Sequence, residues 1–91
     1  MLHTRLDLAR RQLKIIGEIQ EERKVQDAKW GGYSHDDDHD RDLWVKLLRK
    51  HQTRALKAMN KGDLDEYRKH MVRVAALAVA ALESHDRRSG E

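Results

Sequence analysis

A row of basic residues between positions 43 and 62 is the part of this sequence whose spacing best suits chemistry. The segment holds no acidic residue, and four of its basic residues recur at intervals of four, three and four positions. Such intervals place side chains along one face of an α-helix, and a cationic face attracts phosphate-bearing or acidic partners. The four residues in this row are Lys50, Arg54, Lys57 and Lys61.

A second basic segment follows around His70 and Arg73. If the two segments form an antiparallel helix pair, these residues lie opposite His51 and Arg54. Because arginine makes bidentate contacts with phosphate, the pattern predicts an anion-binding pocket. Its predicted ligand-binding residues are Lys50, His51, Arg54, His70 and Arg73. The alternative is a solvated basic face that carboxylates of another helix neutralise.

Arg73 stands out because it lies between two valines at the start of an apolar segment. A charge in such a place is costly unless it is paired, so a bound anion or a carboxylate must satisfy it. The candidate carboxylates on the first predicted helix are Glu21, Glu22 and Asp27. His51 and His70 are expected to be hydrogen-bonded core residues rather than catalysts.

The segment 35–40 concentrates two imidazoles and four carboxylates within six residues. Oxygen and nitrogen donors at this density could hold Mg²⁺, Mn²⁺ or Zn²⁺. The predicted metal ligands are His35, Asp36, Asp37 and His39. The alternative is a solvated acidic loop that caps the following helix through Asp38 or Asp40.

Two aromatic residues, Trp30 and Tyr33, flank a pair of glycines in a segment without helical periodicity. This position suits them to stack on a nucleotide base. Recognition of a DNA sequence is not indicated, because no helix-turn-helix pattern occurs and the acidic run at 36–38 would repel a duplex.

The lack of proline and the abundance of Ala, Leu, Arg, Lys and Glu indicate an all-α fold of three long helices. The first is expected at about 4–28, with Gly17 as a candidate bend or break, and a loop is expected at 29–40. The second is expected at about 41–60. Its predicted buried face consists of Trp44, Leu47, Leu48, His51, Ala55 and Met59.

Gly62 predicts the end of the second helix, because glycine adopts the left-handed conformation without a Cβ penalty. Asp63 and Glu66 then predict a capping box that opens a third helix at about 64–86, giving a C-terminal antiparallel hairpin. The segment 74–82 is apolar on every side, which is typical of a helix buried on every side. Three helices cannot enclose one of their own, so the sequence predicts a homo-oligomeric helical bundle, minimally a dimer.

The chain length of 91 residues suits a single domain, 1–91, although a domain of this size buries only roughly 60% of its unfolded surface. The chain has no cysteine, which excludes disulfides and thiolate metal sites. Charges interrupt its N-terminal segment, and its longest apolar run is far shorter than the about 20 residues that cross a bilayer. We therefore expect a cytoplasmic protein without a membrane partner.

Three segments together resemble a known family. The pattern Glu22-Arg23-x-x-Gln26-Asp27-x-Lys29-Trp30-Gly31 is followed by a loop, by Trp44 near a helix start, and by Val72-Arg73-Val74-Ala75-Ala76. Over about residues 16–87 this is similar to small phage and bacterial MazG-like proteins. The resemblance implies an all-helical, oligomeric relative of nucleoside triphosphate pyrophosphohydrolases.

In that family, Mg²⁺ is held by Glu-Glu-x-x-Glu on one helix and Glu-x-x-Asp on the next. The matching positions here are 50–54 and 70–73, where Lys50, Arg54 and Arg73 replace carboxylates. Cations repel Mg²⁺, which takes oxygen donors. The resemblance thus implies a site converted from binding metal plus phosphate to binding phosphate directly.

On this basis the sequence predicts a non-catalytic nucleotide-binding protein that requires no cofactor. In kind it is similar to phage anti-defence proteins that sequester cyclic nucleotides or related phosphate-bearing signals. One alternative is a metal-dependent MazG-like pyrophosphohydrolase, with Mg²⁺ or another divalent ion on the acidic loop or on Glu18, Glu21 and Glu22. The other is an interaction module whose basic helix docks an acidic partner.

Overall fold

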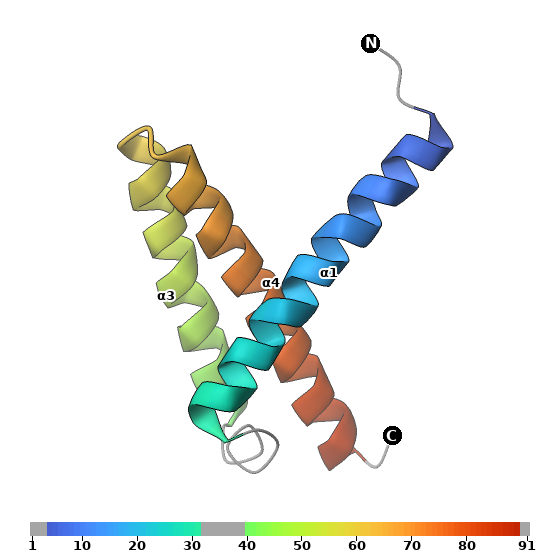
Figure 1. Ribbon diagram of the computed structural model, residues 1–91. Helices are drawn as coiled ribbons and strands as arrows, with labels where there is room; N and C mark the ends of the chain where they lie inside the picture. Colours follow the sequence, from blue (N-terminus) through green and yellow to red (C-terminus); the bar gives the residue numbers. More distant parts are fainter. Residues whose placement is uncertain (1–3, 32–39, 90–91) are drawn as a thin grey trace.

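Three helices make up the fold in the computed structural model, which describes residues 4–31 and 40–89. They are α1 (Arg5–Trp30), α3 (Arg41–Asn60) and α4 (Leu64–Arg88), and the described ranges hold no strand. The predicted all-α class is therefore confirmed. Helices α3 and α4 lie side by side, and α1 crosses α4 at its middle (Figure 1).

Helix α1 runs without interruption through Gly17, so the predicted bend or break there is wrong. It begins after Thr4, whose hydroxyl accepts a hydrogen bond from the Asp7 backbone N–H at 3.1 Å. It ends at Gly31, which takes the left-handed conformation with φ of 90°. Trp30, expected in the following loop, is instead the last residue of the helix.

The turn between α3 and α4 closes at the predicted glycine. Gly62 adopts φ of 77°. Its N–H donates to the Met59 carbonyl, and the Asp63 N–H donates to the Ala58 carbonyl at 2.9 Å, which is the hydrogen-bond pattern of a Schellman motif. The Asp63 carboxylate caps α4 by accepting from the Glu66 N–H. The Glu66 side chain turns to Lys69, so only half of the predicted capping box forms.

A small apolar core joins α3 to α4. Trp44, Leu77 and Ala80 are its fully buried members, and partly buried residues pack around them. The predicted buried face of α3 is right for Trp44 and Ala55, but Met59 is 48% exposed and Ala58 is buried in its place. Adjacent residues of an α-helix point 100° apart, so only one of Ala58 and Met59 can face α4 fully.

The apolar segment 74–82 of α4 is not buried on every side within one chain. Leu77 and Ala80 face inward, whereas Val79 is 38% and Leu82 is 62% exposed. Helix α3 covers one side of α4 and α1 crosses another, which leaves a third side to solvent. This partial burial agrees with the expectation that three helices cannot enclose one of their own, and burial by another copy stays a prediction.

Among the described helices, none combines the length and the apolar character that crossing a membrane requires.

Candidate functional site

A basic cleft of about 380 Å³ lies between α1 and α3, and α4 contributes one residue to it. Four of its lining residues are cations and one is a carboxylate, so the lining carries a surplus of positive charge. Helix α1 provides Glu22, Val25, Gln26 and Lys29, helix α3 provides Leu47, Lys50, His51 and Arg54, and helix α4 provides Arg73.

The residues of each wall share one face of their helix. On α3, Leu47, Lys50, His51 and Arg54 follow one another at three, one and three positions, which is one side of an α-helix. The Asp40 carboxylate fixes the start of α3 by accepting from the Leu43 N–H at 2.7 Å. This face of α3 lines the cleft opposite α1.

Arg73 shares the cleft with its carboxylate neighbour from α1. The Arg73 Nε lies 3.8 Å from Glu22 Oε1, too far for a hydrogen bond, and the two side chains are 40% and 25% exposed. Glu22 was one of the three predicted partners. Helix α1 crosses α4 without covering the Arg73 side chain, which stays partly accessible to a ligand.

Lys50 and Arg54 have no carboxylate partner within the part of the chain that the structure describes. Arg54 also lines a second depression of about 190 Å³ at the turn end of the helix pair, where Lys57, Lys61 and His70 lie with two carboxylates, Asp63 and Glu66. The positive charge of this face is thus only partly neutralised by protein groups.

His51 is held in its neutral form by its surroundings. Burial lowers the pKa of His51 below its ordinary value of 6.5, and the charges of Arg54, His70, Arg73 and Lys50 lower it further. Its Nδ1 is buried and has no hydrogen-bond partner among the described residues. A neutral imidazole with an unsatisfied nitrogen therefore borders the cleft.

His70 stands behind His51 rather than in the basic cleft. The two rings are 5.9 Å apart between centroids and tilted by 37°. His70 is 8% exposed, and its Nε2 lies 3.5 Å from Glu66 Oε2. Of the five predicted basic-pocket residues, the structure brings four to the cleft, and the fifth, His70, borders the second depression instead.

The remaining predicted site residues lie outside what the structure describes. These are the aromatic residue and the proposed metal ligands of the acidic segment, Tyr33, His35, Asp36, Asp37 and His39, together with the side chain of Trp30. Trp30 is the last residue of α1 and directly follows Lys29, which lines the cleft.

Two residues at or beside the cleft are not among the predicted site residues. Lys29 lines the cleft, and Arg23 is the buried arginine at the junction of α1 and α4, 8% exposed. Positions 22, 25, 26 and 29 recur at three, one and three residues, a helical face that could have identified the α1 wall.

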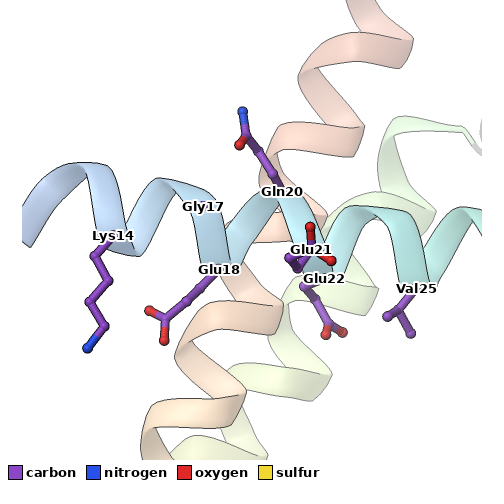
Figure 2. Close-up of a pocket in the computed structure, with 7 residues that line it drawn as sticks. All are labelled: Lys14, Gly17, Glu18, Gln20, Glu21, Glu22 and Val25. Carbon is purple, nitrogen blue, oxygen red and sulfur yellow. The ribbon is translucent and has the colours of Figure 1, made fainter.

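The second proposed metal site, on α1, has its carboxylates engaged with cations. Glu18 forms two hydrogen bonds with Arg68, which lower the pKa of its carboxyl, and Glu21 pairs with Lys24 at 3.0 Å. Figure 2 shows Glu18 and Glu22 leaving α1 on the same side, with Gln20 on the opposite side. Within the described ranges, no group of three metal-ligating side chains converges.

Comparison of the chain with family models, with curated proteins and with solved structures finds no match.

Proposed function

We propose that the protein binds a small phosphate-bearing ligand, a nucleotide, in the basic cleft and releases it unchanged. The supporting observation is that Lys50, Arg54 and Arg73, which come from two helices, line one cleft with an excess of positive charge. A concave surface of one sign concentrates ligands of the opposite sign. Its volume of about 380 Å³ is at the lower end of small-molecule sites, which suits one nucleotide.

The cleft offers different groups to the two ends of such a ligand. Arg54 and Arg73 supply planar guanidinium groups for phosphate oxygens, and Lys50 adds a point charge. Val25 and Leu47 supply an apolar wall for a base. The long Arg73–Glu22 separation of 3.8 Å means that Arg73 can take a phosphate without breaking a hydrogen bond.

The replacement of metal-binding carboxylates by cations supports binding without hydrolysis. In pyrophosphohydrolases of the MazG type, acidic residues hold the metal that activates water, whereas here the matching positions carry three cations, Lys50, Arg54 and Arg73, and two histidines. Fixed cations stabilise a bound phosphate but cannot remove a proton from water. We therefore assign the chain to nucleotide sequestration, comparable in kind to phage anti-defence proteins, and not to catalysis.

The same proposal includes a homo-oligomer, minimally a dimer, built around α4. Leu82 and Val79 support it, because they lie on the most apolar segment of the chain and remain exposed in the single copy. Burial of such side chains against another copy removes apolar surface from water.

Ligand-dependent thermal unfolding tests the binding proposal. With a panel of cyclic and linear nucleotides plus inorganic pyrophosphate, one member at 100 times its Kd should add about 2.7 kcal/mol to the free energy of unfolding. Chromatography should recover that compound unchanged. Arg54→Ala and Arg73→Ala should each remove the stabilisation.

The matched control is Arg49→Ala, since Arg49 is exposed on α3 and does not line the cleft. This variant should keep the response to the ligand. If no compound in the panel stabilises the protein, the proposal fails. If Arg49→Ala weakens binding as much as Arg54→Ala, a diffuse basic face that docks acidic partners replaces it.

A further inference from the structure

Most of the N-terminal half of α1 lies away from the other two described helices. Residues 5–16, here called the arm, continue past the crossing with α4 and project away from the helix pair (Figure 1). Its five large apolar side chains are between 44% and 68% exposed. They are Leu6, Leu8, Leu13, Ile15 and Ile16.

The arm has the sequence pattern of an amphipathic helix that buries one side. With 100° of turn per residue, the apolar residues fall on one half of the helix, interrupted by Gln12 and by Arg5 at its end. The opposite half carries Arg10, Arg11 and Lys14. A helix that stands alone in water gains nothing from such segregation, so the apolar half is suited to a partner surface.

The whole chain exposes more surface than a monomer of its size. Its accessible surface is 7004 Å², against about 5,500 Å² for a folded monomer of 10.7 kDa. Its radius of gyration is 15.1 Å, against about 12 Å for a compact domain of this length. Covering an excess of about 1,500 Å² on each of two chains gives an interface of about 3,000 Å², the size of an obligate homodimer.

A matching surface exists on the third side of α4. Leu64, Met71 and Leu82 are spaced by seven and eleven positions, so they share one face, and they are 65%, 44% and 62% exposed. Beside this face, an apolar groove of about 180 Å³ begins where Ile15 and Ile19 of α1 meet Met71. The exposed face of α4 therefore adjoins the root of the arm.

We infer that the arm packs on the exposed face of α4 in a second copy of the chain, whose own arm packs back in the same way. This exchange covers both unpartnered surfaces at once, whereas pairing arm with arm would leave Leu64, Met71 and Leu82 in water. Reciprocal contacts between two different surfaces satisfy the two-fold symmetry of a homodimer. The inference rests on the self-association in the proposed function and is independent of nucleotide binding.

Sedimentation analysis of two neighbouring charge variants tests the use of the arm. The wild type should have twice the chain mass of 10.7 kDa. Leu13→Glu should raise the dimer dissociation constant at least about 100-fold, because a leucine is lost from both copies of the interface. Lys14→Glu, which places the same residue on the polar half of the arm, should leave the constant within about threefold.

Leu13 is 68% exposed in the single chain, so Leu13→Glu should not disturb the fold of a monomer, and circular dichroism should show an unchanged helix content. A wild type of monomeric mass would overturn both the self-association and the arm interface. A dimer that Leu13→Glu leaves intact would overturn the arm interface alone.

Cross-linking identifies the surface that the arm meets. The natural chain has no cysteine, so engineered cysteines report one contact each. A mixture of Leu13→Cys and Leu82→Cys chains, treated with a short bis-maleimide, should yield a cross-linked heterodimer. Efficient linkage within Leu13→Cys alone, without linkage in the mixture, would show arm against arm and overturn the proposed exchange.

Discussion

Arg23 anchors α1 to α4 at the level of single residues. Its Nε lies 3.3 Å from Glu83 Oε1, and its Nη1 donates to Gln26 Oε1 at 3.2 Å. Its Nη2 lies 3.1 Å from Asp27 Oδ1, close enough for an ion pair but not aligned as a hydrogen bond. A buried guanidinium with partners on two helices fixes where the helices cross.

Replacement of the two arginines should therefore have unequal effects on stability. Arg23→Ala should lower the free energy of unfolding by about 2 kcal/mol, since it removes charge-assisted hydrogen bonds at a buried position. Arg73→Ala should cost less than about 1 kcal/mol, because Arg73 is 40% exposed and its partner is distant. Urea unfolding at one fixed protein concentration measures both. Equal losses would contradict the assignment of the anchor to Arg23.

His51 should make stability depend on pH below neutrality. Folding lowers the pKa of His51, so the unfolded chain binds a proton that the folded chain excludes. Neutral His51 contributes fully to the free energy of unfolding above pH 6.5. This contribution is lost as the pH falls from 6.5 through the lowered pKa of His51 in the folded chain. His51→Gln should make the melting temperature depend less on pH between pH 7.5 and 5.5.

The exposed His85 offers a control for this effect. His85→Gln should retain the wild-type fall in melting temperature on acidification. A His51→Gln protein with the same pH dependence as the wild type would mean that another group causes it.

At the scale of the helices, two glycines have opposite roles. Gly62 needs its positive φ of 77° to close the turn, whereas Gly17 is an ordinary helical residue beside which a Cβ would meet no atom within 4 Å. Gly62→Ala should lower the free energy of unfolding by about 1 kcal/mol. Gly17→Ala should raise it by up to about 1 kcal/mol. Chemical unfolding measures both, and a stabilised Gly62→Ala would contradict the left-handed turn.

The helices were predictable from the sequence because their signals are local. Gly62 and Asp63 mark the turn, and Asp40 marks the start of α3, each through a hydrogen bond to a residue at most five positions away. The face that α1 turns toward α4 was not predictable. It depends on which charges meet across a crossing, and the Arg23–Glu83 pair joins residues 60 positions apart.

The candidate site was predictable to the extent that it lies on one helix. Lys50, His51 and Arg54 follow from the periodicity of α3, and the turn brings Arg73 of α4 to them. Lys29 was missed because it reaches the cleft only through the position of α1. The burial of His70 outside the cleft was not predictable, since a face pattern does not specify how deeply two helices interlock.

At the scale of the whole molecule, α1 is held by polar links rather than by a large apolar core. Its contacts with α4 include the pairs Glu18–Arg68, Glu22–Arg73 and Arg23–Glu83. The buried apolar cluster belongs to α3 and α4. The two main walls of the cleft, α1 and α3, are accordingly joined mainly through their contacts with α4.

Helix α1 is a continuous rod of 26 residues, about 39 Å long. One end carries Gln26 and Lys29 of the cleft wall, and the other end is the arm. Because α1 is one continuous helix, a compound that moved it at the cleft would also move the arm. Because such coupling is reciprocal, the strength of subunit pairing and the affinity for the bound compound would each report on the other.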